Sequence, residues 1–235
     1  MTIEEYNSTV VEIYDKLYSA DDIKRNQACT DALKLIEKLE KNSHKNDVRK
    51  MIIFHLLDSR RFDEANNCID ALLSSEDYYY KSSGMTAKIE YCKMCDQDNI
   101  ENAINSARAL AKLTMHKADY AAYSLEYAKY QYKMGKNDEC IESLGDVIVI
   151  SEELNNIRFA LAAKYYTALA VNKKGLKEVS LELLRDVTEK ACDVRSQHAA
   201  MFSELKRAEI LNEVGREIES TEIVKQWCIN FETQL

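Results

Sequence analysis

The stretch from Leu125 to Val147, LEYAKYQYKMGKNDECIESLGDV, carries a spacing that returns twice further along the chain. Its turn glycine, Gly135, recurs as Gly175 and Gly215, at steps of 40 residues. Four further sets of residues keep the same step: Leu125, Tyr165 and Leu205; Ala128, Ala168 and Ala208; Leu144, Leu184 and Val224; Val147, Val187 and Trp227. Five sets in phase make chance a poor explanation, and they predict an internal structural repeat.

Each repeat predicts a pair of antiparallel helices. A glycine such as Gly135 can adopt a positive φ and end a helix in a tight turn. Ala128, seven residues earlier, is small enough to let a neighbouring helix approach closely. The apolar residues after the turn, such as Leu144 and Val147, form the packing face of the return helix, so that neighbouring pairs bury each other's apolar faces.

The first half of the chain carries the same unit less regularly. The return helices align on a small residue, in order Ala28, Ala65, Ala103, Cys140, Ser180 and Ser220. The resulting repeats span approximately residues 3–41, 46–75, 83–115, 117–153, 155–193 and 195–233. We expect an irregular segment from Ser74 to Gly84. No linker interrupts the chain, which predicts one continuous domain over residues 1–235.

The composition supports an all-α protein. The 235 residues are 46% hydrophobic, which is too apolar for a disordered chain. Pro is absent and only 5 glycines occur, whereas sandwiches and barrels need many Gly- and Pro-rich turns. The expected architecture is therefore a solenoid of about six antiparallel helix pairs.

Charge and cysteine content restrict the possible partners and compartment. The formal net charge of -8 predicts no direct binding to nucleic acid and none to anionic membranes, because both need an attractive field. No apolar run approaches the ~18 residues of a membrane span. The start of the sequence has no secretory signal pattern, and 7 cysteines is an odd number. Reduced thiols in the cytoplasm are therefore expected.

The stretch from Arg60 to Leu72 resembles the turn and second helix of a tetratricopeptide repeat, with an aromatic residue, an acidic pair and an alanine in order. Gly135 with Ala128 resembles the small-residue pairs of the same motif. The spacing of 37 to 40 residues exceeds the family's period of about 34, and Ser180 and Ser220 stand where the family prefers Ala. The resemblance implies a right-handed α-solenoid, in a variant with long helices.

No motif for catalysis or cofactor binding is visible, so we expect no enzyme, no cofactor and no metal. Cys92 and Cys95 form a lone C-x-x-C, whereas a zinc site needs a second pair of ligands. His55 and Cys68 both lie in apolar runs, which favours packing over a nucleophilic pair.

The resemblance also implies a binding groove, because in that family the first helices of successive pairs line the concave face. The groove residues implied by this mapping are Lys50, Lys88, Lys129, Tyr132, Lys133, Tyr165, Asn172 and Asn212. Some members of the family grip carboxylates with Lys and Asn, which here implies an acidic peptide or a C-terminal carboxylate as partner. Ordinary solvated lysines would give the same pattern, and the sequence leaves both interpretations open.

The expected function is therefore protein binding without catalysis, as an adaptor or scaffold that holds a partner peptide or protein in its concave groove. The alternative is a peptide-sensing regulatory domain of a signalling or transcription-regulating system. The last helix, Arg216 to Glu232, is rather apolar for the end of a repeat array. We expect Trp227 to pack inward, and Ile223 or Phe231 to offer a homodimer contact.

Overall fold

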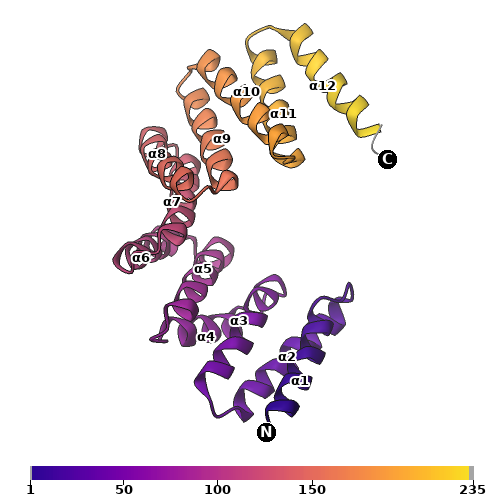
Figure 1. Ribbon diagram of the computed structural model, residues 1–235, viewed down its shortest axis with the longest axis vertical. Coiled ribbons are helices and arrows are strands. Elements are labelled where there is room, and N and C mark those ends of the chain that lie inside the picture. Colours follow the sequence, from indigo (N-terminus) through magenta and orange to yellow (C-terminus); the bar gives the residue numbers. More distant parts are fainter. Residues whose placement is uncertain (1, 233–235) are drawn as a thin grey trace. The chain divides into compact units, whose positions relative to one another are not determined.

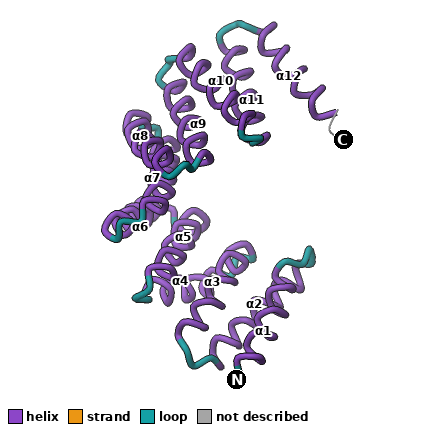
Figure 2. Tube along the Cα trace, in the orientation of Figure 1, coloured by secondary structure: helices purple, strands orange, loops and turns teal. Residues whose placement is uncertain are grey.

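The computed structural model describes the backbone of residues 2–232 and the side chains through Trp227. Within these residues the chain forms α-helices, one short 3-10 helix and tight turns, without a strand (Figure 2). This confirms the predicted all-α class. Every helix in the same range is too short or too polar to cross a lipid bilayer.

The chain divides into two compact units, Met1–Leu110 and Ala111–Leu235. The first unit contains helices of unequal length, which Figure 1 shows in indigo to magenta. They are α1 (Ile3–Leu17), α2 (Asp22–Lys38), α3 (Asn42–Asp58), α4 (Phe62–Leu73), α5 (Tyr78–Cys95), the 3-10 helix η1 (Gln97–Asn99) and α6 (Ile100–Leu113), which ends in the second unit. Whether the two units behave as one domain stays a prediction.

The second unit is more regular. Its helices are α7 (Lys117–Lys133), α8 (Asn137–Glu153), α9 (Ile157–Lys173), α10 (Lys177–Asp193), α11 (Gln197–Glu213) and α12 (Glu217–Glu232). The first five have 17 residues each, and each helix begins 20 residues after the previous one. The structure thus confirms three helix pairs in the second unit, with turns at Gly135, Gly175 and Gly215.

Every turn of the second unit contains one residue in the left-handed region. The glycines Gly135, Gly175 and Gly215 have φ of 75°, 82° and 78°. The alternate turns use other residues with φ of 60°, 51° and 56°: Met115, Asn155 and Arg195. In each turn, the N–H of the residue after the left-handed one donates to the carbonyl five residues earlier. The N–H of Lys136, for example, donates to the carbonyl of Gln131 at 2.9 Å. This is the Schellman arrangement, which satisfies carbonyls at the end of a helix.

Small residues join the two helices of each pair in the second unit. Ala168 of α9 faces Ser180 of α10, and the Ser180 hydroxyl donates to the Ala168 carbonyl at 2.8 Å. Ser220 donates in the same way to the carbonyl of Ala208 at 2.9 Å. All four residues are buried. The serines that replace the alanine expected from the resemblance therefore keep the close approach and add a buried hydrogen bond.

Helix contacts identify the inner side of each unit. In the second unit α7 contacts α9 and α9 contacts α11, and in the first unit α1 contacts α3 and α3 contacts α5. Among the described residues, no comparable contact joins α2 to α4 or α8 to α10. Successive first helices are therefore closer together than successive second helices, which makes the first-helix side concave within each unit.

Two local expectations have different outcomes. The segment from Tyr78 to Gly84 is helical rather than irregular, because the Asp77 carboxylate caps α5 by accepting from the N–H of Tyr79 at 2.9 Å. An ideal Cβ at Gly84 would lie 3.0 Å from the Cβ of Leu72, so glycine lets α5 approach α4 closely. The inward packing of Trp227 is confirmed, since it lies against the cluster of Leu161, Val187, Ala191 and Ala200.

Two glycine substitutions should change stability in opposite directions. Gly175→Ala should lower the free energy of unfolding by about 1 kcal/mol, because alanine is strained at positive φ although nothing lies within 4 Å of its Cβ. Gly145→Ala is the matched control inside α8, and it should raise the free energy of unfolding by about 0.5–1 kcal/mol. Urea unfolding of both variants provides the measurement. If both substitutions changed the free energy of unfolding in the same direction, the requirement for glycine at the Gly175 turn would be contradicted.

Candidate functional site

Three tyrosine rings from two successive first helices gather in the second unit. The rings of Tyr132 in α7 and Tyr166 in α9 have centroids 6.2 Å apart at 72°. Tyr166 also meets its neighbour Tyr165, with centroids 5.7 Å apart at 86°. Both contacts are edge-to-face, the arrangement that the ring quadrupole favours.

These tyrosines are half-buried because their rings belong to the core. Tyr132 and Tyr166 pack against the cluster that includes Leu125 and Leu144, and Tyr165 packs against the cluster that includes Leu184. Burial raises the pKa of both Tyr132 and Tyr165 above the usual value for a phenol. The phenols therefore stay neutral and available as hydrogen-bond partners at neutral pH.

Helix α11 continues the same surface. Lys206 acts electrostatically on the pKa of Tyr132, and Glu209 acts on the pKa of both Tyr132 and Tyr165. Phe202 and Leu205 share a face of α11 with Lys206 and Glu209, because spacings of three, four and seven residues fall on one side of a helix. Phe202 is 55% exposed and Leu205 is 46% exposed.

We call this surface the first-helix face of the second unit. It consists of Glu126, Lys129, Tyr132, Tyr165, Tyr166, Phe202, Leu205, Lys206 and Glu209. It combines half-buried aromatic rings, two exposed apolar side chains and charged groups, a composition typical of protein interfaces.

The lysines of this face pair with glutamates of their own helix. The Lys129 ammonium lies 2.7 Å from the Glu126 carboxylate and 5.6 Å from the Tyr166 ring centroid. The Lys206 ammonium lies 2.7 Å from the Glu209 carboxylate. The centre of the face is therefore close to neutral rather than basic.

The remaining predicted groove residues of the second unit lie near the C-terminal ends of their helices. Lys133 of α7 is exposed, and so is Asn212 of α11. The Oδ1 atom of Asn172 in α9 is buried without a hydrogen-bond partner among the described residues. Lys173 occupies in α9 the position that Lys133 occupies in α7, one repeat earlier.

The two predicted lysines of the first unit already have partners. Lys50 of α3 places its ammonium 3.5 Å from the ring centroid of Tyr79 in α5. Lys88 of α5 donates to Oδ1 of Asn66 in α4 at 3.2 Å, and its ammonium lies 4.7 Å from the Tyr91 ring centroid. The Lys88 ammonium thus reaches a second helix.

Six of the eight predicted residues belong to the second unit and two to the first.

Sequence reasoning missed several members of the first-helix face. Tyr166, Phe202, Leu205, Lys206 and Glu209 were not among the expected groove residues. The step of 40 residues contains the signal for two of them, since Leu205 follows from Tyr165 by one step and Glu209 from Lys129 by two steps. The apolar character of Phe202 and Leu205 would instead suggest the core, because exposure depends on the neighbouring helix.

The cysteine and histidine candidates have structural surroundings. Burial raises the pKa of Cys68 to about 11 and lowers the pKa of His55, which favours their uncharged forms. Cys92 is buried, whereas Cys95 is exposed and its thiol donates to the Tyr91 carbonyl at 3.2 Å. In the described part of the chain, no group of three or more His, Cys, Asp or Glu residues is arranged to hold a metal ion.

Solved structures with the same arrangement of helices are repeat proteins. A putative kinesin light chain from Podosopora anserina, with nearly identical TPR-like repeats, is 17% identical, with a TM-score of 0.65 over 83% of this chain and 99% of that chain. A variant of that protein with one substitution gives a TM-score of 0.66 with the same identity and coverage. The apo form of RapI is 10% identical, with a TM-score of 0.71 over 94% of this chain and 95% of that chain.

These likenesses show a fold of the tetratricopeptide-repeat type, as the sequence predicts. No family model and no curated protein matches the sequence.

Substitutions on this face should separate core residues from surface residues. Tyr165→Ala should lower the free energy of unfolding by about 2–3 kcal/mol, because it removes a ring packed against Leu184. Phe202→Ser should change it by less than about 0.5 kcal/mol, because the ring is mostly exposed. Thermal unfolding followed by circular dichroism tests both variants, and a large loss with Phe202→Ser would show that this ring belongs to the core.

Proposed function

We propose that the chain is a non-catalytic adaptor or scaffold that binds a peptide segment of a partner protein on the first-helix face of the second unit. The observation that carries this proposal is the exposure of Phe202 and Leu205 beside the half-buried tyrosines. The TPR-like fold supports a role in protein interaction in general terms.

The composition of the face supports a peptide with an apolar anchor. Burying the exposed parts of Phe202 and Leu205 against a partner stabilises the complex by about 25 cal/mol per Å² of apolar surface. Tyr165 and Tyr166 are already ordered by the core, so little side-chain entropy is lost when a partner contacts them. Their hydroxyls can exchange hydrogen bonds with water for hydrogen bonds with peptide groups.

An acidic group or C-terminal carboxylate on the peptide fits best near Lys133 and Lys173. Neither lysine has an ion-pair partner among the described residues, in contrast to Lys129 and Lys206. The Oδ1 atom of Asn172, next to Lys173 in sequence, is buried without a hydrogen-bond partner among the described residues. An exposed ion pair at Lys133 would contribute only about 0.2–1 kcal/mol, so the apolar anchor supplies most of the affinity.

A peptide-sensing regulatory domain is the second candidate function. The likeness to RapI favours this second candidate. The solved RapI structure is an apo form, and the alignment with it covers nearly the whole of both chains. A sensor should change its radius of gyration when the peptide binds, whereas a rigid adaptor should not. Small-angle X-ray scattering with and without peptide distinguishes the two.

Two further features of the proposal concern assembly and compartment. Ile223 packs against the cluster of its own unit, and the side chain of Phe231 lies outside the described residues. A homodimer contact through Phe231 stays a proposal, and the exposed Val224 is a further candidate on α12. The six described cysteines are all free, which suits a reducing cytoplasm.

A display library of random dodecapeptides, panned against the immobilised full chain, tests the proposed face. The selected peptide should bind Phe202→Asp and Leu205→Asp at least about tenfold more weakly than the unmodified chain, because a carboxylate replaces an apolar contact. Lys225→Ala on α12 is the control, since this exposed lysine belongs to a second helix. Calorimetry gives the dissociation constants.

Equal losses of peptide affinity in the control and in the two face variants would place the binding site outside the first-helix face. A selected peptide that binds all three variants with unchanged affinity would also exclude the first-helix face. Circular dichroism of each variant separates loss of binding from loss of folding.

A further inference from the structure

Most of the exposed aromatic side chains lie on the first helices of the first unit. Among the described residues, five Phe, Tyr and Trp side chains are exposed, and four of them belong to α1, α3 and α5. Each of the four is between 41% and 66% exposed, namely Tyr14, Tyr18, Phe54 and Tyr79. The first unit thus carries a surface of rings that its own core leaves largely uncovered.

Ring contacts connect the three helices along this surface. The Tyr18 ring of α1 meets the His55 ring of α3 edge-on, with centroids 5.5 Å apart. The Lys50 ammonium of α3 lies 3.5 Å from the ring centroid of Tyr79 in α5. Phe54 shares a side of α3 with Lys50, because a spacing of four residues falls on one side of a helix.

We call this surface the tyrosine face of the first unit. It consists of Tyr14, Tyr18, Phe54, His55, Asp58 and Tyr79.

The contact between Lys50 and Tyr79 shows that a tyrosine ring of this face holds a cation. A separation of 3.5 Å is well within the about 6 Å over which the ring quadrupole attracts an ammonium or a guanidinium. Tyr14 and Tyr18 form a second pair of rings, with centroids 4.5 Å apart and planes tilted by 40°. In the described part of the chain, no Lys or Arg side chain lies over this second pair.

Carboxylates without partners lie beside the Tyr14 and Tyr18 rings. Asp58 is the exposed last residue of α3, and it acts electrostatically on His55, the ring that Tyr18 contacts. The exposed carboxylate of Asp15 acts in the same way on Tyr14. Neither carboxylate has an ion pair or a hydrogen bond among the described residues. A cation is therefore the charge that this end of the face attracts.

The positive groups nearby do not cancel this attraction. Arg25, a cation that acts electrostatically on His55, is ion-paired with Asp22. Burial lowers the pKa of His55, which favours the uncharged imidazole. The negative ends of α1 and α3 lie at Leu17 and Asp58, beside the same rings. Residues 1–110 as a whole carry 20 Asp and Glu against 15 Lys and Arg.

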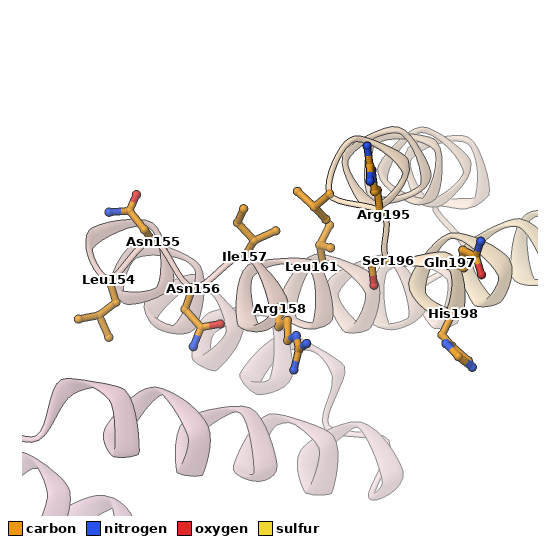
Figure 3. Close-up of a pocket in the computed structure, with 11 residues that line it drawn as sticks. Leu154, Asn155, Asn156, Ile157, Arg158, Leu161, Arg195, Ser196, Gln197 and His198 are labelled. Carbon is orange, nitrogen blue, oxygen red and sulfur yellow. The ribbon is translucent and has the colours of Figure 1, made fainter.

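The charged groups of the second unit's edge cavity are arranged differently. This cavity of about 680 Å³ lies where α8 turns into α9 and α10 turns into α11. Figure 3 shows Arg158 and His198 extending to one side of α9 and α11, and Arg195 to the other. Its basic side chains thus diverge, whereas the rings and carboxylates of the tyrosine face lie together.

We propose that the tyrosine face of the first unit binds a basic segment of a partner protein, with an Arg or Lys side chain of that segment on the Tyr14 and Tyr18 rings. A guanidinium stacks on aromatic rings and pairs with a carboxylate such as Asp58 at the same time. Phe54 offers apolar contact to the methylene stem of such a side chain. Charge complementarity selects a basic segment over an acidic one.

A display library of random dodecapeptides, panned against the full chain, identifies ligands of this face. Counter-selection against the double variant Tyr14→Leu/Tyr18→Leu removes every peptide that does not need the two rings, and it leaves the charge of the chain unchanged. The retained peptides should be enriched in Arg and Lys relative to the library. Enrichment in Asp and Glu, an unchanged composition, or no retained peptide would each overturn the proposal.

Calorimetry with one retained peptide then tests the charge of the face. Asp58→Lys should weaken binding at least about tenfold, because it replaces an attraction with a repulsion. It should not lower the midpoint of thermal unfolding, since a lysine is favourable in the last turn of a helix. Glu37→Lys is the matched control, because Glu37 is exposed in the last turn of the second helix α2, on the side that faces α4.

The control should keep its affinity within about twofold of the unmodified chain. Equal losses in Asp58→Lys and Glu37→Lys would show general attraction to an acidic chain and would overturn the proposal. Tyr18→Phe should bind normally, because the face of the ring remains, and a loss as large as that of the double variant would exclude the ring contact. The peptide selected on the first-helix face of the second unit should bind Asp58→Lys normally, so the two surfaces fail or succeed independently.

Discussion

The left-handed residue at every turn of the second unit is the constraint on which its other regularities depend. One such residue every 20 positions closes a helix of 17 residues and reverses the chain with the same hydrogen bonds each time. Because the helices are equal in length, each first helix packs against the next in the same register. For the same reason, small residues of the two helices in a pair face each other, as Ala168 and Ser180 do. In the first unit the helices vary from 12 to 18 residues, and this strict phase is absent.

The same register makes the first-helix face a scaffold on which the chemistry can change from one repeat to the next. Equivalent positions carry Glu126, Tyr166 and Lys206 in successive first helices, while the backbone geometry around them repeats. The repeat position that carries the Tyr166 ring in α9 therefore carries an acidic side chain in α7 and a basic side chain in α11. Packing of the rings into the core keeps the face ordered before a partner binds, which lowers the entropy lost on association.

The fold could be predicted from the sequence wherever one residue type was required, and the candidate site only in part. Gly135 is recognisable because glycine adopts a positive φ without cost. Met115 and Arg195 adopt the same conformation without a local signal, because packing of the flanking helices overrides local preference. On the first-helix face, Lys129 pairs with Glu126, a contact that a spacing of three residues permits without requiring it. The exposure of Phe202 and Leu205 in α11 could not be predicted from the sequence either, because it depends on which side of that helix its neighbour covers.

Charge compensation on the first-helix face indicates what kind of ligand this surface selects. On the first-helix face, each central lysine has a nearby glutamate, so long-range attraction is weak and selection depends on shape and apolar contact. The exposed apolar side chains of this face are therefore a stronger indication of a peptide ligand than its charged groups are.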